Sequence, residues 1–266
     1  MKILITAGGT TEKIDNVRSI TNSSTGRLGA AIAEAFIHSE NLPLEELIYL
    51  CGQTAVIPRS DKANIIRIGG VNELYTQIES LLKTEKIDVV IHSMAVSDYT
   101  VDTVTTKNAV GSAVLAFLES QPQHGIEAEK LSGLSSRIAN AAFDNADNRT
   151  AQNKISSDLE DLILVMKKTP KVIGIIKKLQ PETILVGFKL LSNAGFDTLL
   201  DVGYNLLKKN NCDLVLANDL SQITDNKHTG YLISPDKTYE KHESRQEIAQ
   251  AMVEKVIKIL KRNKKL

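Results

Sequence analysis

The stretch LITAGGTTEKIDNVRSITNSSTGRLGAAIAEAF, residues 4–36, decides the fold class of this chain. A short apolar run ends at Gly8 and Gly9, and an apolar pattern with helical spacing begins after Gly26. Strand, glycine turn and helix in this order are typical of nucleotide-binding α/β proteins. The usual G-x-G-x-x-G fingerprint is absent, because the polar residues 10–25 separate the two glycine turns. The question is therefore what chemistry needs two such turns with a polar loop between them.

Alternating strands and helices repeat along the rest of the chain. Short apolar runs predict buried strands, and runs with a 3.6-residue apolar period predict helices. The expected strands are 2–7, 46–52, 87–95, 183–188 and 212–219. The expected helices are 26–39 (with Ser24 or Thr25 as N-cap), 71–83, one within 197–209, and about 244–262. We therefore expect an α/β fold with a doubly wound, mostly parallel Rossmann-like sheet and a C-terminal hairpin at 230–242.

One long segment interrupts this alternation. Residues 104–153 are mostly small and polar with weak periodicity, and only 109–120 has the pattern of a helix. An insertion of this length in a compact domain is usually a lid or an arm that contacts another subunit. We expect a single Rossmann-like domain over 1–266 that carries 104–153 as a flexible lid or dimerisation insertion.

Composition argues against several classes of partner. The 266 residues include 32 Lys plus Arg and 32 Asp plus Glu, so no net charge attracts nucleic acid or an anionic membrane. The sequence contains no apolar run long enough to span a bilayer and no signal peptide before the first strand. Cys51 and Cys212 lie in or beside apolar strand-like runs, as reduced structural thiols do. These features predict a cytoplasmic protein without a nucleic-acid or membrane partner.

Missing motifs disfavour several classes of enzyme. The five histidines show no ligand spacing with cysteines or acids, which argues against a metal site. The G-x-S-x-G motif of α/β-hydrolases and the G-x-x-x-x-G-K-[ST] motif of P-loop NTPases are absent. Tyr204 and Lys208 have the Y-x-x-x-K spacing of short-chain dehydrogenases, although the glycine turn of those enzymes is missing. That spacing leaves a nicotinamide-dependent reductase as an alternative.

The expected strand ends carry residues suited to a ligand. Ligands of open parallel sheets bind at the carboxyl ends of the strands. In this chain those ends combine small residues with Asp98 and Asn218, which permit close backbone approach and polar selectivity. The sequence NSSTG, residues 22–26, precedes a helix and offers hydroxyl and N–H groups to an anion such as phosphate. A site for a phosphorylated ligand is therefore expected at this edge.

Four motifs together resemble the phosphopantothenate–cysteine ligases (phosphopantothenoylcysteine synthetases) of coenzyme A biosynthesis. The motifs are ITAGGT with DNVRSITNSSTGRLG, then AVSDY, then NKISS, then GFKL with DLVLAND, and they extend over residues 3–219. The pattern V-R-x-I-x-N-x-S-x-G-x-x-G in the first motif is the most specific. We expect the stand-alone form of the ligase, because no flavin-dependent decarboxylase domain precedes the first motif.

The resemblance implies a ligase that works in two steps. The carboxylate of 4′-phosphopantothenate attacks the α-phosphate of a nucleoside triphosphate, releasing pyrophosphate and leaving an acyl-nucleotide. The amine of L-cysteine then attacks the acyl carbon, expels the nucleoside monophosphate and gives 4′-phospho-N-pantothenoylcysteine. Mg²⁺ is expected with the triphosphate, and positioning and charge neutralisation are expected to supply the catalysis.

The resemblance also implies a role for each matching residue. The implied nucleotide-binding residues are Gly8, Ser24, Gly26, Gly29, Asp98, Lys154, Phe188 and Asn218. The implied substrate-binding residues are Arg18, Asn22, Met94, Ala95 and Asp98. Asn22 on the acyl group and Lys154 on the triphosphate are the implied catalytic residues, while Phe188 and Asn218 flank the base and ribose. Arg18 would bind the substrate phosphate across the interface of a homodimer.

Some residues depart from the bacterial pattern of this family. Residues 154–157 read K-I-S-S where many bacterial relatives read K-I-K-K, which removes two positive charges near the triphosphate. GFKLLSN resembles the ATP-using eukaryotic form, whereas the AND motif favours the CTP-using bacterial form. We expect CTP, with ATP as the alternative, and leave open whether Lys208 or Lys209 contacts the triphosphate. The missing lysines also leave a catalytically silent nucleotide-binding module as a further alternative.

Overall fold

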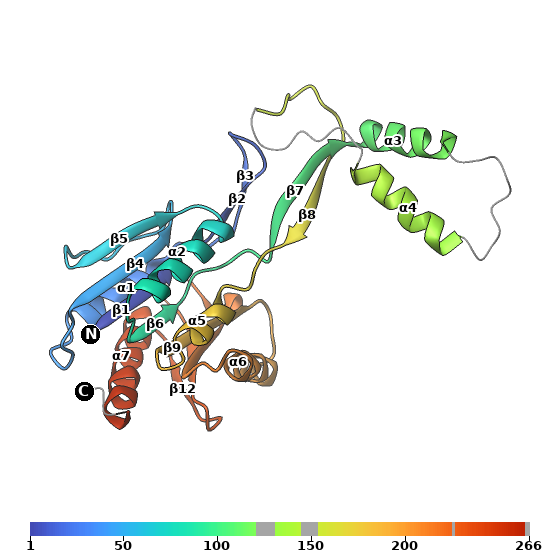
Figure 1. The fold of residues 1–266 in the computed structure, drawn as a ribbon. Coiled ribbons are helices and arrows are strands. Elements are labelled where there is room, and N and C mark those ends of the chain that lie inside the picture. The colour runs from blue at the N-terminus through green and yellow to red at the C-terminus, as the bar shows by residue number, and fades with distance from the viewer. Residues whose placement is uncertain (121–130, 145–153, 225–226, 264–266) are drawn as a thin grey trace. The chain divides into compact units, whose positions relative to one another are not determined.

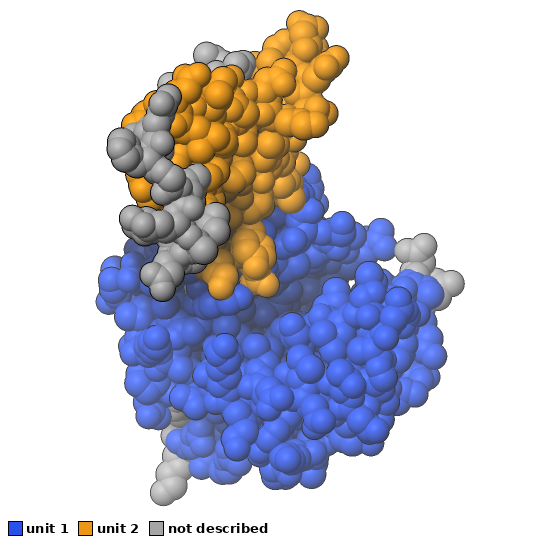
Figure 2. Space-filling model, turned by 90° about the vertical axis from the view of Figure 1, so that its right-hand side faces the viewer, with its two compact units in different colours: residues 1–11, 21–97, 170–266 blue, residues 12–20, 98–169 orange. Residues whose placement is uncertain are grey.

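The chain folds into two compact units, which Figure 2 colours separately. Unit 1 comprises residues 1–11, 21–97 and 170–266, and unit 2 comprises residues 12–20 and 98–169. The computed structural model describes residues 1–120, 131–144, 154–224 and 227–263. Two parts of the expected insertion, 121–130 and 145–153, therefore lie outside the described residues.

Over the described residues, unit 1 is built on an eight-stranded sheet with the strand order β12-β11-β10-β9-β6-β1-β4-β5 (Figure 1). The strands are β1 (Lys2–Ala7), β4 (Glu46–Gly52), β5 (Ala63–Ile68), β6 (Val89–His92), β9 (Ile184–Leu191), β10 (Leu214–Asp219), β11 (Gly230–Ile233) and β12 (Tyr239–His242). Six of these strands, β5, β4, β1, β6, β9 and β10, are parallel and lie in the order of a Rossmann fold. The β11–β12 hairpin adds two antiparallel strands. The expected fold class and the C-terminal hairpin are confirmed.

Helices cover both faces of this sheet (Figure 1). On one face lie α1 (Arg27–Ile37) and α7 (Arg245–Arg262). On the other lie α2 (Val71–Thr84), α5 (Ile173–Leu179) and α6 (Phe196–Asn210). A short 3₁₀ helix, η2 (Leu220–Gln222), follows β10. The two layers of helices explain why the central strands read as unbroken apolar runs.

Strand β1 illustrates this double burial. Ile3 and Ile5 pack into the core beneath α1 and α7, whereas Leu4 packs into the core beneath α2, and all three are fully buried. Successive side chains of a strand point to opposite faces, so a strand covered on both sides needs an apolar residue at every position. Ile3, Leu4 and Ile5 meet that requirement, and the buried Thr6 lies 2.9 Å from Nδ1 of His92 through its hydroxyl oxygen.

Unit 2 contains an antiparallel strand pair, β7 (Tyr99–Thr106) and β8 (Leu162–Lys168), and two helices. Helices α3 (Lys107–Glu119) and α4 (Leu131–Asp144) pack on each other. Helix α4 was not expected, because its small and polar residues give a weak apolar period. Two short strands, β2 (Thr11–Lys13) and β3 (Ser19–Thr21), pair with each other at the two ends of residues 12–20. A lid or dimerisation role for this insertion stays a prediction.

The beginning of α1 differs from the expectation. Neither Ser24 nor Thr25 is the N-cap; that position belongs to Gly26, whose φ of 74° is left-handed. A side chain with a Cβ rarely adopts this conformation, and glycine does so without strain. The first turn of α1 therefore starts from a backbone turn: Gly26 supplies no side-chain cap, and the Arg27 N–H donates to the Thr25 hydroxyl over 3.5 Å.

His92, the last residue of β6, predicts a pH-dependent stability for unit 1. Burial lowers the pKa of His92 to about 4, and its Nδ1 lies 2.9 Å from the Thr6 hydroxyl oxygen. The unfolded chain binds a proton near pH 6.5 and the folded chain does not, so stability is full above pH 6.5 and falls towards pH 4. We expect the wild type to lose about 2 kcal/mol more than His92→Gln between pH 7.5 and pH 5. Urea unfolding followed by circular dichroism measures this difference; equal losses would contradict it.

Candidate functional site

The carboxyl edge of the unit 1 sheet carries a cavity of about 730 Å³. Four segments that are far apart in the sequence supply most of its wall: 23–29, 93–96, 188–190 and 218–224. The expected site residues that line it are Ser24, Gly26, Gly29, Met94, Ala95, Phe188 and Asn218. The structure therefore gathers around one cavity most of the unit 1 residues that the motifs single out.

The wall of this cavity is positively charged. Arg27, Lys189 and Arg245 line it together with His228, and none of the described lining residues is Asp or Glu. The first turn of α1 also borders the cavity, and the N–H groups at a helix start carry partial positive charge. Such a surface favours a polyanion such as a triphosphate.

Sequence reasoning missed these four residues as members of the site. Lys189 lies inside the quoted GFKL motif and Arg27 lies inside DNVRSITNSSTGRLG, so membership of a motif was the available signal. His228 and Arg245 lie outside every quoted motif. Only the fold brings them to the edge where β10 and β9 end.

The two glycine turns pack on each other, which explains their separation in the sequence. A Cβ on Gly26 would lie 3.3 Å from the Gly8 nitrogen, and a Cβ on Gly8 would lie 2.5 Å from the Cβ of Ala55. Gly8 also has a left-handed φ of 80°. Gly8 is not one of the described residues that line the cavity. It packs against the turn at Gly26, which does line the cavity. The polar loop between them is thus free to carry other contacts.

Asn22 is fixed against the segment that follows β6. Its Nδ2 donates to the Ala95 carbonyl oxygen over 3.0 Å, and the same carbonyl accepts from the Thr10 N–H over 3.1 Å. The Ala95 N–H in turn donates to the Gly8 carbonyl over 2.8 Å. The first glycine turn, Asn22 and Ala95 therefore form one hydrogen-bonded assembly beside the cavity, and Asn22 itself is not among the residues that line it.

The AND motif at the end of β10 divides its polar residues between two tasks. Asn218 lines the cavity, and its Nδ2 lies 3.1 Å from Nε2 of the buried His228. Asp219 instead accepts from the N–H groups of Asn193, Ala194 and Ser221 and from the Ser221 hydroxyl. These bonds, that of the Ser221 hydroxyl first, lower the pKa of Asp219 to about 2. Asp219 is therefore a structural residue that holds the loops around Asn218.

In unit 2, Asp15 binds Arg18 and the NKISS segment together. The Asp15 carboxylate accepts from the Arg18 side chain over 2.7 and 3.0 Å, from the Val17 and Arg18 N–H groups, and from the Ile155 N–H over 3.1 Å. The Arg18 guanidinium also donates to the Ile155 carbonyl over 2.8 Å. These bonds, those of the Arg18 side chain first, hold the pKa of Asp15 well below its usual range. A buried, ionised Asp15 thus fixes Arg18 beside the residue that follows Lys154.

The other two expected residues of unit 2 are exposed. Lys154 begins the described part of the NKISS segment. Asp98 directly precedes β7, and its carbonyl oxygen accepts from the Thr169 N–H over 3.1 Å. Arg18, Asp98 and Lys154 therefore belong to unit 2, whereas Asn22 and the cavity belong to unit 1.

The residues behind the reductase alternative lie elsewhere in unit 1. The hydroxyl of Tyr204 donates to the Pro235 carbonyl over 3.5 Å, and the ammonium groups of Lys208 and Lys237 lie over its ring. Neither Tyr204 nor Lys208 lines the cavity. Lys208 and Lys209 occupy the last turn of α6, which leads to the amino end of β10. Tyr204 and Lys208 therefore lie away from the cavity at the carboxyl edge of the sheet.

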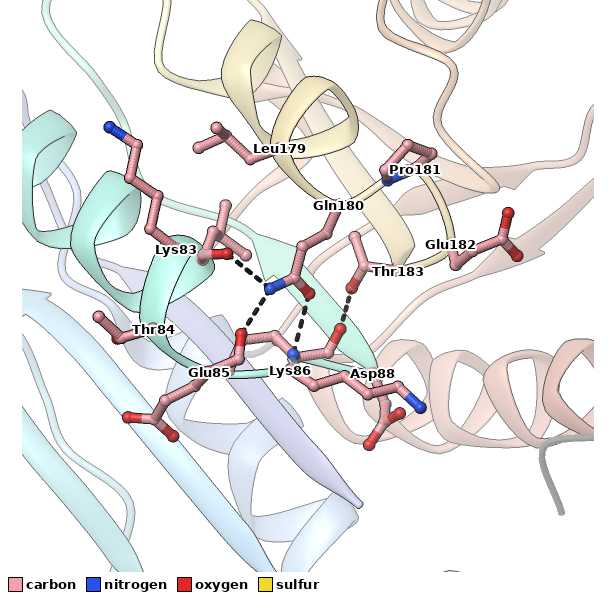
Figure 3. Close-up of a pocket in the computed structure, with 12 residues that line it drawn as sticks. Lys83, Thr84, Glu85, Lys86, Asp88, Leu179, Gln180, Pro181, Glu182 and Thr183 are labelled. Carbon is pink, nitrogen blue, oxygen red and sulfur yellow. Dashed lines mark hydrogen bonds between the residues drawn. The ribbon is translucent and has the colours of Figure 1, made fainter.

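A second hollow of about 470 Å³ lies at the amino edge of the same sheet, where β6 and β9 begin (Figure 3). Its centre is the Gln180 side chain, whose amide nitrogen donates to the Leu82 and Glu85 carbonyls and whose oxygen accepts from the Ile87 N–H. The Thr183 hydroxyl donates to the Ile87 carbonyl over 2.6 Å. These groups join the two strand entries, so we assign the hollow a structural role.

No described helix combines the length and the apolar character that a membrane crossing requires. The described residues also contain no group of three or more His, Cys, Asp or Glu side chains placed to hold a metal ion. Cys51 and Cys212 are free and buried, and burial raises the pKa of both thiols.

Comparison with known families covers nearly the whole chain. Residues 1–122 and 127–260 match the model of the DNA/pantothenate metabolism flavoprotein C-terminal domain. The coenzyme A biosynthesis bifunctional protein CoaBC of Thermococcus kodakarensis is 30% identical over 235 residues, which are 88% of this chain and 45% of that protein. CoaBC of Methanocaldococcus jannaschii is 27% identical over 262 residues, 98% of this chain and 51% of that protein. The chain thus spans about half the length of these curated relatives.

Solved structures agree on the fold. The crystal structure of the DNA/pantothenate metabolism flavoprotein from Streptococcus pneumoniae is 33% identical, with a TM-score of 0.75, and covers 96% of this chain and 98% of its own. The Cab2 mutant H337A in complex with phosphopantothenate-cysteine is 20% identical, with a TM-score of 0.64, over 98% of this chain and 86% of its own. The second likeness concerns the fold alone.

Proposed function

The chain belongs to the family of DNA/pantothenate metabolism flavoprotein C-terminal domains, and from this premise we propose that it joins 4′-phosphopantothenate to L-cysteine. The product is 4′-phospho-N-pantothenoylcysteine, an intermediate of coenzyme A biosynthesis. The names of the CoaBC relatives support the pathway, and the product named with the Cab2 structure supports the reaction. We place this reaction in the cytoplasm, in keeping with two free, buried thiols.

The observation that carries the proposal is the cationic cavity at the carboxyl edge of the sheet. It combines a helix start, three cationic side chains and an aromatic ring, Phe188, in one wall. These features suit a nucleoside triphosphate, because its phosphates bind to positive charge and its base stacks on a flat apolar face. We propose CTP as the nucleotide, with ATP as the second candidate.

The proposed chemistry needs no nucleophile from the protein. A carboxylate oxygen of phosphopantothenate forms a bond to the α-phosphorus while the bond to pyrophosphate breaks. The cysteine nitrogen then forms a bond to the acyl carbon, the nucleoside monophosphate leaves, and the nitrogen releases its proton to solvent. Charge neutralisation and positioning are the tasks left to side chains. Mg²⁺ would accompany the triphosphate, since this ion is bound largely through phosphate oxygens and water.

Each expected residue has a proposed task. Asn22 holds the acyl group through its amide, beside Ala95 and Met94 on the pantothenoyl arm, and Asp98 binds that arm. Lys154 neutralises the triphosphate, and Arg18 binds the substrate phosphate. In the nucleotide site we propose Gly8, Ser24, Gly26, Gly29, Asp98, Lys154, Phe188 and Asn218, to which the cavity wall adds Arg27, Lys189 and Arg245.

An assay of the purified protein tests this function. The protein is incubated with Mg²⁺, phosphopantothenate, cysteine and either CTP or ATP. The reaction should release pyrophosphate together with CMP or AMP, and mass spectrometry should detect the amide product. Oxidation of NADPH by the same protein would favour the reductase. Nucleotide binding without turnover would favour a silent binding module.

We further propose that the active unit is a homodimer in which Arg18 completes the site of the neighbouring copy. At phosphopantothenate concentrations well below KM, chains with Arg18→Ala and chains with Asn22→Ala are each expected to show only a small fraction of normal activity. A mixed dimer contains one site with both native residues, so random exchange should restore about a quarter of the normal activity. Absence of recovered activity in dimers shown to be mixed would place Arg18 in the site of its own chain.

A further inference from the structure

The contact between Asn218 and His228 lies in the wall of the cavity. Asn218 is 7% exposed and His228 is 6% exposed, and both line the cavity. Nδ2 of Asn218 lies 3.1 Å from Nε2 of His228. Nδ1 of His228 is buried and has no hydrogen-bond partner among the described residues. A buried polar atom of this kind is costly unless a ligand or water pairs with it.

The protonation of the imidazole decides what this pair offers. Burial, together with the nearby Arg245 charge, lowers the pKa of His228 to about 4, so the ring is neutral near pH 7. An amide N–H of Asn218 donates to Nε2, and a neutral imidazole whose Nε2 accepts carries its proton on Nδ1. The same bond turns the amide so that Oδ1 is the part left to accept. On Asn218 the pair therefore leaves Oδ1 as an acceptor and the second amide N–H as a donor, while Nδ1 of His228 stays buried.

We propose that His228 is a positioning residue that orients the Asn218 amide and makes the nucleotide site prefer amino bases, cytosine or adenine, over oxo bases, uracil or guanine. The inference rests on the proposed function, because it takes the ligand of this cavity to be a nucleoside triphosphate. Cytosine and adenine carry an exocyclic amine beside a ring nitrogen that accepts. Uracil and guanine present the reverse pattern, a carbonyl beside a ring N–H. An acceptor at Oδ1 matches the first pair and opposes the second.

Calorimetric titration of the protein with Mg²⁺ and each of CTP, ATP, UTP and GTP tests the inference without turnover. The wild type should bind the better of CTP and ATP about ten- to hundredfold more tightly than UTP or GTP. His228→Leu should lose most of that ratio, because nothing then fixes the amide. His228→Gln should keep much of it, since the Gln carbonyl can accept from Asn218. A matched control variant, His242→Leu, changes a histidine outside the cavity and should behave as the wild type.

The outcomes separate this inference from the proposed function. Tight binding of all four nucleotides by the wild type, or a preference for UTP and GTP, overturns the role of His228 and leaves the ligase proposal standing. Equal weakening of all four by His228→Leu, with the ratio unchanged, shows a merely structural role and also overturns it. Failure of every nucleotide to bind overturns both proposals. If His228→Leu does not fold, the wild-type ratio and its retention in His228→Gln decide the matter.

Discussion

Asn22→Ala and Lys154→Gln should each lower product formation about 100-fold or more, and they should do so at different steps. Asn22 is proposed to hold the acyl group, so without it the acyl-nucleotide should still form but react slowly with cysteine. Lys154 is proposed to neutralise the triphosphate, so without it the acyl-nucleotide should not form. Rapid-quench measurement of the first turnover separates the cases: a pyrophosphate burst in Asn22→Ala and none in Lys154→Gln.

Two exposed residues serve as matched controls for these variants. Asn64→Ala, on β5, and Lys167→Gln, on β8, make the same chemical changes away from the proposed sites. Both should show a normal burst and normal turnover. Near-normal turnover in Asn22→Ala and Lys154→Gln as well would overturn the residue assignment.

Asp15→Asn should impair the enzyme more than Arg18→Ala does, although Asp15 itself touches no substrate in the proposal. Asp15 accepts from the Arg18 guanidinium and from the Ile155 N–H, so it positions both the phosphate-binding arginine and the chain beside Lys154. An amide at this position would set its own N–H groups against the donors that the carboxylate now accepts from. We expect the KM for phosphopantothenate to rise about tenfold or more, as for a lost charge-assisted contact, and the acyl-nucleotide burst to slow.

The ionisation state of Asp15 at the pH of an assay supports this expectation. The pKa of Asp15 is held low, so its stabilising contribution is present above about pH 4 and is lost only as the pH falls below that value. The carboxylate is therefore ionised throughout any ordinary assay. Asp102→Asn removes an exposed carboxylate that pairs with Lys167 in the same unit, and it should leave kinetics unchanged. Equal kinetics for Asp15→Asn and Asp102→Asn would contradict the positioning role.

Local sequence patterns were sufficient for most of the Rossmann-like unit. Strands β1 and β4 begin and end where their apolar runs do, and α2, α6 and α7 agree with the expected helices within about two residues. These elements are buried on one or both sides, so burial imposes a periodic pattern. Helix α4 lacks such a pattern because most of its described residues are exposed or half-buried. The N-cap of α1 was misjudged because a backbone turn at Gly26, and not a hydroxyl, starts the helix.

The candidate site was harder to predict, because its chemistry depends on residues that the fold brings together. Arg27, Lys189 and Arg245 line one cavity although long stretches of chain separate them. Hydrophobic periodicity and motif spacing in a sequence do not show that three cationic side chains meet at the ends of different helices and strands. The same holds for Asp15 and Ile155, whose contact spans 140 positions. Motif resemblance assigned no role to Arg27, Lys189, Asp15 or Ile155, although all four lie inside the quoted motifs, and Arg245 lies outside every motif.

If this chain activates a carboxylate as an acyl-nucleotide before it forms the amide, the two oxygens of that carboxylate must end in two different products. Phosphopantothenate labelled with ¹⁸O at both carboxylate oxygens is converted with cysteine and CTP, and the products are examined by mass spectrometry. We expect one ¹⁸O in each CMP, the other in the amide carbonyl, and none in pyrophosphate. Label in inorganic phosphate, or amide formation with unlabelled CMP, would contradict this expectation.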